Sequence, residues 1–228
     1  MTTLLSLEDV SMRYPMHGKG GAAVHVVFEN ISLELATGER LGIVGRNGSG
    51  KSTLLRLMAK IFAPTSGCVR WAPGITVSLL SLGLGFRPDL TGRENALLSC
   101  LLQGLSKADA KSKLSEIEDF AELEDFFHQP VKTYSTGMRA RLGFASALMN
   151  RSDVILIDEV LSVGDHQFRL KAKEALKNRL TEGRGVVVVS HAEEQIKEFC
   201  SCVTRLNETT LAKPDAVEEV LLDVNKAD

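Results

Sequence analysis

The hydrophobic and polar positions of this chain follow two different strand patterns. Residues 5–10 and 31–35 alternate apolar and polar side chains, which predicts antiparallel strands with one exposed face. Residues 40–44, 154–157 and 185–189 are apolar except for Arg40, which is typical of parallel strands buried on both faces. The first part of the chain is therefore expected to add a small antiparallel sheet to a buried parallel one.

Helical periodicity appears in other parts of the chain. An apolar stripe follows the third strand, at Leu54, Leu55, Leu57, Met58 and Ile61. Leucines at 97, 98, 101 and 102 share one helical face, and residues 106–127 form a charged amphipathic stretch. The apolar positions of that stretch are Leu114, Ile117, Phe120, Leu123 and Phe126.

The order of these elements indicates the fold class. Strands and helices alternate in an α/β core, and residues from 88 to about 150 are helical in character. We expect a single domain over residues 1–228 with this helical segment inserted into it. A further strand is expected over 75–80, and the glycine-rich residues 17–21 predict a flexible loop.

Composition excludes several classes of function. The chain has 228 residues and a net charge of −2, so no basic excess indicates nucleic acid as a partner. The N-terminus lacks the features of a signal peptide, and no apolar run is long enough to span a bilayer. The four cysteines do not have zinc-ligand spacing, so we expect reduced thiols.

Residues 45–53, GRNGSGKST, match the phosphate-binding loop of nucleoside triphosphatases. The glycines let the backbone turn and bring its N–H groups close to phosphate. Lys51 supplies positive charge near the β- and γ-phosphates, and the Ser52 hydroxyl is a ligand for Mg²⁺. The strand before the loop and the helix after it are the context that the motif requires. The expected nucleotide-binding residues of the loop are Gly45, Asn47, Gly48, Ser49, Gly50, Lys51, Ser52 and Thr53.

Two acids follow the buried strand 154–157, and a histidine follows the strand 185–189. The carboxyl ends of parallel strands meet at the edge of the sheet where nucleotides bind. We therefore expect Asp158 to hold Mg²⁺ together with Ser52, and Glu159 to polarise the attacking water. His191 is expected to contact the γ-phosphate.

These motifs, in this order, resemble the ATP-binding subunit of ABC transporters over nearly the whole chain. The resemblance implies a P-loop fold of the RecA type, with an antiparallel β subdomain and an inserted α-helical subdomain. Residues 161–165 occupy the place of the D-loop, which gives Asp165 a role beside the nucleotide. Tyr14 occupies the place of an aromatic residue that stacks on adenine, with Phe28 as the alternative.

Residues 134–138, YSTGM, occupy the place of the ABC signature and keep Ser135 and Gly137. In the family this motif acts in trans, so the resemblance implies a homodimer with each ATP between two copies. The signature and residues 82–95, LGLGFRPDLTGREN, are similar to the subfamily that exports polysaccharides. That subfamily moves capsule, lipid-linked O-antigen or teichoic acid across the bacterial inner membrane.

The resemblance implies a set of partners and a location. A transmembrane permease would hold the chain, as a peripheral subunit, at the cytoplasmic face. No C-terminal carbohydrate-binding domain is expected, because the chain stops at Asp228. Phe86 and Leu90 are expected to be exposed for docking to the permease, or else to fill the cleft between subdomains.

One position departs from the family pattern, and other functions stay open. The family's glutamine between the subdomains is absent, and Ser81 lies nearest to its place. Alternatives are an importer or drug-exporter subunit, a soluble ABC ATPase acting on nucleic acid or ribosomes, and a P-loop kinase or GTPase.

Overall fold

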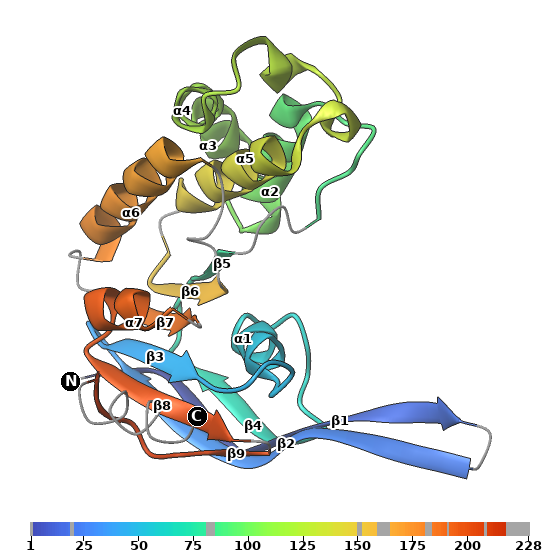
Figure 1. Ribbon diagram of the computed structural model, residues 1–228, viewed down its shortest axis with the longest axis vertical. Coiled ribbons are helices and arrows are strands. Elements are labelled where there is room, and N and C mark those ends of the chain that lie inside the picture. The colour runs from blue at the N-terminus through green and yellow to red at the C-terminus, as the bar shows by residue number, and fades with distance from the viewer. Residues whose placement is uncertain are drawn as a thin grey trace. The chain divides into compact units, whose positions relative to one another are not determined.

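The computed structural model describes residues 2–18, 21–80, 85–149, 152–158, 165–180, 184–190, 192–207 and 209–217. It divides into two compact units, drawn in Figure 1. The first unit comprises Met1–Thr76, Asp153–Asp158 and Glu182–Asp228. The second comprises Val77–Ser152 and Glu159–Thr181. Each unit is described by itself.

An antiparallel sheet of strand order β2-β1-β4 begins the first unit. Its strands are β1 (Thr3–Gly18), β2 (Gly21–Ala36) and β4 (Ser66–Trp71). The antiparallel strands predicted over 5–10 and 31–35 are confirmed as parts of β1 and β2. The flexible loop predicted over 17–21 is wrong at residues 17, 18 and 21, because the two strands continue until Gly18 pairs with Gly21, and residues 19–20 lie outside the described residues.

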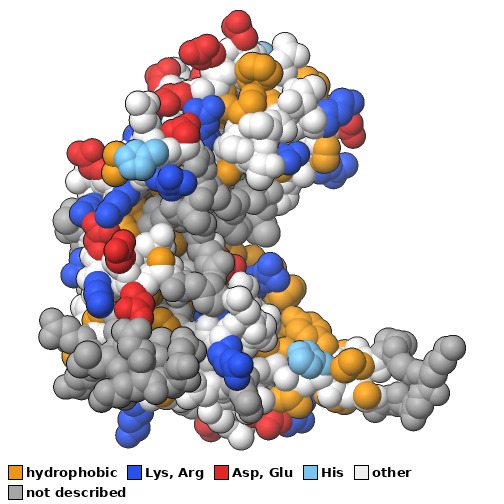
Figure 2. Space-filling model, in the orientation of Figure 1, with side chains coloured by type: hydrophobic (Ala, Val, Ile, Leu, Met, Phe, Trp, Pro, Cys, Tyr) orange, Lys and Arg blue, Asp and Glu red, His pale blue; other side chains and the backbone are white. Residues whose placement is uncertain are grey.

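Beyond the sheet, β1 and β2 continue as a two-stranded ribbon (Figure 1). Tyr14, Met16 and Val24 on this ribbon are exposed. Hydrophobic side chains accordingly gather along it in Figure 2. Backbone pairing between β1 and β2 forms this ribbon. The glycines between the two strands indicated a loop and gave no sign of this pairing.

A mostly parallel sheet forms the centre of the first unit, in the order β10-β8-β3-β7-β6, with β10 antiparallel to β8. The strands are β3 (Arg40–Val44), β6 (Val154–Asp158), β7 (Gly185–Val189), β8 (Cys202–Asn207) and β10 (Asp215–Ala216), and β9 (Thr210–Leu211) pairs with β8. β3, β6 and β7 are parallel and almost wholly buried, which confirms the three apolar runs as strands. Their carboxyl ends therefore lie at one edge.

Two helices of the first unit are α1 (Lys51–Met58) and α7 (Glu193–Phe199). The predicted stripe of α1 is buried at its four leucine and methionine positions. Ile61 is the exception, with 45% of its side chain exposed. The helix ends at Met58, so Ile61 lies past its end and does not continue the stripe.

The second unit contains β5 (Val77–Leu80) and several helices. These are α2 (Gly92–Leu102), α3 (Lys107–Ser112), α4 (Leu114–Ala121), η1 (Glu124–His128), η2 (Val131–Thr133), α5 (Thr136–Leu148) and α6 (His166–Leu180). The amphipathic stretch predicted over 106–127 is interrupted, because Glu122 and Glu124 have positive φ angles of 52° and 47°. The interruption changes the helical phase, so Phe127 is buried and Phe126 is 49% exposed.

A hydrophobic cluster built from α2, α3, α4 and α5 forms the core of the second unit. Phe86 is half-buried against this cluster, and Leu90 is also half-buried. Both side chains are therefore only partly exposed, and their role in docking the permease stays a prediction. The loop before α2 folds onto the helices, and this packing partly buries its apolar side chains.

Asn95 fixes that loop. The side chain is fully buried, and its Oδ1 accepts a hydrogen bond from the Arg87 N–H at 2.7 Å. Its Nδ2 donates to the carbonyl oxygens of Arg87, Leu90 and Thr91, each at 3.0 Å. Thr91 in turn caps α2 through a reciprocal pair of hydrogen bonds with Glu94. The segment 91–95, TGREN, therefore has a structural role of its own.

Tyr134 packs against the first residue of α2. Its ring is buried, and its hydroxyl donates to the Phe126 carbonyl at 2.5 Å. A Cβ on Gly92 would overlap this hydroxyl. Burial raises the pKa of Tyr134 to about 12, so the hydroxyl stays protonated as a donor. Tyrosine at 134 thus requires glycine at 92.

We expect Gly92→Ala to lower the free energy of unfolding by about 2 kcal/mol, because a methyl group would be forced against the Tyr134 hydroxyl. The comparison is the same substitution in a Tyr134→Phe background, which removes the overlapping oxygen. Denaturant unfolding of the parent, both single variants and the double variant measures the coupling. Strictly additive effects would contradict the Gly92–Tyr134 contact.

Candidate nucleotide-binding site

The loop between β3 and α1 has a backbone that requires glycine. Gly48 and Gly50 have φ angles of 80° and 95°, in the left-handed region that other residues rarely adopt. A Cβ on Gly50 would lie 2.5 Å from the Val27 Cγ1, and a Cβ on Gly45 would overlap the Leu206 carbonyl oxygen. The loop is therefore packed closely against β2 and β8.

Lys51 turns back into this loop. Its side chain is buried, and its Nζ donates to the carbonyl oxygens of Gly45 and Arg46, both at 2.8 Å. The ammonium is thereby fixed inside the loop. A bound phosphate would meet a positive charge that is already in place.

The start of α1 offers further groups to an anion. Gly50 is the N-cap residue and gives no side-chain cap, and the first turn carries no acid. The N–H groups of the first turn point out of the helix end and carry its positive dipole. The Ser49 hydroxyl is buried and has no hydrogen-bond partner among the described residues. These groups suit a ligand rich in oxygen acceptors.

Ser52 and Asp158 come together from distant parts of the sequence. Ser52 lies in the first turn of α1, and Asp158 ends β6. The Ser52 hydroxyl donates to the Asp158 Oδ1 at 3.0 Å. Two hard oxygen atoms side by side, next to the loop that Lys51 closes, fit a Mg²⁺ ion.

A serine and a glutamine after β7 were missed by the sequence analysis. The Ser190 hydroxyl accepts from the Ala192 N–H at 3.0 Å and donates to the Gln195 Oε1 at 2.8 Å. These bonds fix residues 190 and 192 at the start of α7. The N-cap residue of α7 is Ala192, which has no capping side chain, so the capping preferences that sequence reasoning uses gave no signal here. His191 and Glu159 lie outside the described residues, as does Ser81.

Tyr14 and Phe28 differ sharply in exposure. Tyr14 pairs with His25 in the ribbon and is 36% exposed, so part of its side chain is accessible. Phe28 is fully buried, with ring atoms within 3.5 Å of the position that a Cβ on Gly50 would take. Phe28 therefore supports the loop from the core, and the stacking role of Tyr14 stays a prediction.

Ser135 and Gly137 belong to the second unit. Ser135 is the N-cap of α5, and its hydroxyl accepts from the Met138 N–H at 3.1 Å. Both Ser135 and Thr136 are exposed, and a Cβ built on Gly137 would lie 3.8 Å from the Ser135 hydroxyl. Apart from the Met138 N–H, which Ser135 caps, the N–H groups at this exposed helix start suit an anionic ligand.

Asp165 stands just before α6. Its Oδ1 accepts from the Phe168 N–H at 2.9 Å, and this bond holds the pKa of the carboxyl below its usual value. The carboxylate is thus a start signal for α6. Its predicted place beside a nucleotide stays a prediction.

The comparison with protein families gives the context for this geometry. The family model described as "ABC transporter" matches residues 28–162, which include the loop, the signature region and β6. The chain belongs to the ABC transporter family. As in other ABC proteins, the fold is that of an ATP-binding cassette.

The dimeric post-hydrolysis structure of the cassette MJ0796, bound to ADP and Pi, is 25% identical, with a TM-score of 0.78. The match covers 94% of this chain and 99% of that one.

Curated relatives of this ABC chain carry the names of export proteins. It is 42% identical over 191 residues to "Teichoic acids export ATP-binding protein TagH" of Levilactobacillus brevis, covering 84% of this chain and 52% of that protein. It is 39% identical to "O-antigen export system ATP-binding protein RfbE" of Yersinia enterocolitica, covering 90% and 95%. The chain thus spans about half of the first relative and nearly all of the second. Among the described residues, no helix has the length and apolar character needed to cross a bilayer.

The two motif glycines with left-handed backbone give a matched pair of variants. Gly48→Ala adds a methyl group in open space and is expected to cost about 1 kcal/mol of stability from backbone strain alone. Gly50→Ala adds the same strain and a 2.5 Å approach to Val27, so we expect roughly 2 to 4 kcal/mol. Denaturant unfolding measures both. Equal losses would contradict the close packing of the loop on β2.

Proposed function

We propose that this chain is the ATP-hydrolysing subunit of an ABC exporter that moves a lipid-linked polysaccharide, such as O-antigen, teichoic acid or capsule. The observation that carries the proposal is the Ser52–Asp158 pair beside the loop closed by Lys51. Hydroxyl, carboxylate and ammonium are the groups that a metal-bound triphosphate requires. The names of the curated relatives support the polysaccharide as cargo.

The residues have distinct tasks in this proposal. Lys51 and the N–H groups of the loop offset phosphate charge, while Ser52 and Asp158 would hold Mg²⁺. The metal, when bound, neutralises charge that develops on the β- and γ-phosphate oxygens. Glu159 orients or deprotonates the attacking water, and His191 holds the γ-phosphate. The Ser190–Gln195 hydrogen bond ties the residue before the histidine to α7.

Hydrolysis requires two copies of the chain. Each ATP lies between the loop of one copy and the Ser135 and Gly137 of the other, whose helix start faces the γ-phosphate. The dimeric state of the MJ0796 cassette with ADP and Pi supports this arrangement. Asp165 lies near the shared site, and Tyr14 stacks on adenine.

The closing dimer drives a membrane permease. We propose that residues 1–228 form one ATP-binding domain, in which the helical segment at about 88–150 transmits closure to the permease. The chain would then be a peripheral subunit at the cytoplasmic face of the bacterial inner membrane. Lipid-linked glycan crosses through the permease, so its recognition lies outside this chain.

Glu159→Gln should lower ATP turnover by about 10²-fold or more, because the amide cannot accept a proton from water. ATP binding should persist, and ATP should hold the variant as a stable dimer. Phosphate release and sedimentation velocity measure the two effects. The control is Glu194→Gln, on the exposed face of α7. Parental turnover in Glu159→Gln would refute the assigned role.

Deletion of the gene in its source bacterium tests whether the transported molecule is a polysaccharide. We expect loss of one surface polysaccharide and build-up of its lipid-linked precursor inside the cell. The parental gene should restore export, and Glu159→Gln should not. Unchanged surface polysaccharides with altered uptake or drug resistance would assign the chain to another class of ABC transporter.

A further inference from the structure

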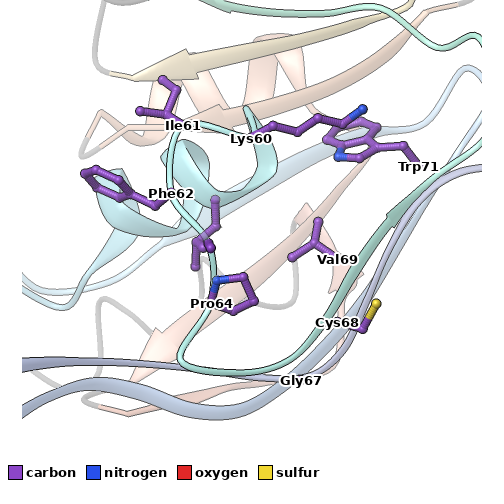
Figure 3. A pocket seen from close by; sticks show the side chains of 10 residues that line it. Lys60, Ile61, Phe62, Pro64, Gly67, Cys68, Val69 and Trp71 are labelled. Atoms are coloured by element: carbon purple, nitrogen blue, oxygen red, sulfur yellow. The ribbon is translucent and has the colours of Figure 1, made fainter.

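A groove in the first unit shares no lining residue with the phosphate-binding loop. It lies between the end of α1, the loop that follows it and β4, and its volume is about 580 Å³. The lining is mainly apolar and includes Leu57, Ile61, Phe62, Pro64, Val69 and Trp71. In Figure 3, Pro64 and Val69 lie between this loop and β4. The volume is in the range of ligand-binding pockets.

Lys60, beside this groove, has an unfavourable backbone conformation. The Ile61 N–H donates to the Arg56 carbonyl and the Lys60 N–H to the Leu57 carbonyl, which together form a Schellman end to α1. Lys60 occupies the position where glycine is preferred, with φ of 58°. A lysine here accepts strain that glycine would avoid. Such strain is a reason to look for a function of the side chain.

Two cations at the end of α1 lie over aromatic rings. The Lys60 Nζ is 5.4 Å from the centre of the Trp71 ring, and the Arg56 guanidinium is 6.0 Å from that of Phe62. Within the part of the chain that the structure describes, neither cation is within ion-pair distance of a carboxylate. Arg70, on the neighbouring strand β4, is by contrast paired with Glu8 at 3.1 Å.

We propose that this groove binds an amphipathic, acidic segment of a partner protein. A carboxylate of the segment would pair with Lys60, and its apolar side chains would cover Ile61 and Trp71. The charge argument is specific, since Lys60 is the one charged residue among those lining the groove. The exposed Ile61 supplies apolar area at the rim. The proposal does not depend on the proposed transport function.

Trp71 makes the groove observable, because it is the single tryptophan of the chain. The full chain is titrated with a synthetic amphipathic peptide of leucine and glutamate, and Trp71 emission is recorded. A peptide with lysine in place of glutamate and vesicles of phosphatidylglycerol are the two comparison probes. We expect a saturable shift with the acidic peptide alone. An equal response to the basic peptide, a response only to vesicles, or no response to any probe would overturn the proposal.

Lys60→Gly distinguishes the effect of the lysine side chain on binding from the effect of the backbone conformation on stability. Glycine suits the left-handed position, so the variant should unfold at a higher temperature than the parent. Its affinity for the labelled acidic peptide, measured by anisotropy, should nevertheless fall about fivefold, as for loss of one exposed ion pair. Lys60→Arg should keep the affinity. Undiminished binding by Lys60→Gly would overturn the proposal, as would equal losses in both variants. Nucleotide binding should be unchanged in both.

Discussion

The ammonium of Lys51, held between the carbonyl oxygens of Gly45 and Arg46, is the interaction on which the first unit's site depends. A buried cation needs acceptors close by, and only a tightly turned backbone supplies two carbonyls at that distance. The turn demands glycine at 48 and 50, and the close packing under it demands Phe28 and Val27 in the core. The buried position of the Lys51 ammonium therefore depends on both the loop backbone and the sheet beneath it.

In the second unit, other contacts position the start of α5, where Ser135 is proposed to bind the nucleotide. Ser135 begins α5, and the residue before it is locked by the buried Tyr134. Gly92 leaves room for the tyrosine hydroxyl, and Asn95 secures the loop before α2. Residues 92 and 134, which the sequence places 42 positions apart, therefore form one support for the signature. The contact links, within this chain, the two segments on which the subfamily resemblance rests.

Sequence reasoning succeeded where a single periodicity or motif decides the outcome. The strands β3, β6 and β7 follow from continuous apolar runs, and the Ser52–Asp158 pairing follows from the edge at which parallel strands end. It failed where long-range pairing or backbone strain decides. The β1–β2 ribbon replaces a predicted loop, and the left-handed Glu122 and Glu124 shift Phe126 to the surface. The partial burial of Phe86 depends on tertiary packing that no local pattern shows.

The most direct test of the shared site mixes two inactive variants. Lys51→Ala disables the loop of its own copy, while Ser135→Asp keeps a helix-capping side chain and adds a negative charge against phosphate. Ser135→Asn is the neutral capping control. With random pairing, half of the dimers are hybrids, each with one intact composite site, so an equal mixture should recover up to roughly a quarter of parental ATP turnover. A mixture as inactive as its components, with hybrid dimers shown to form, would contradict the account.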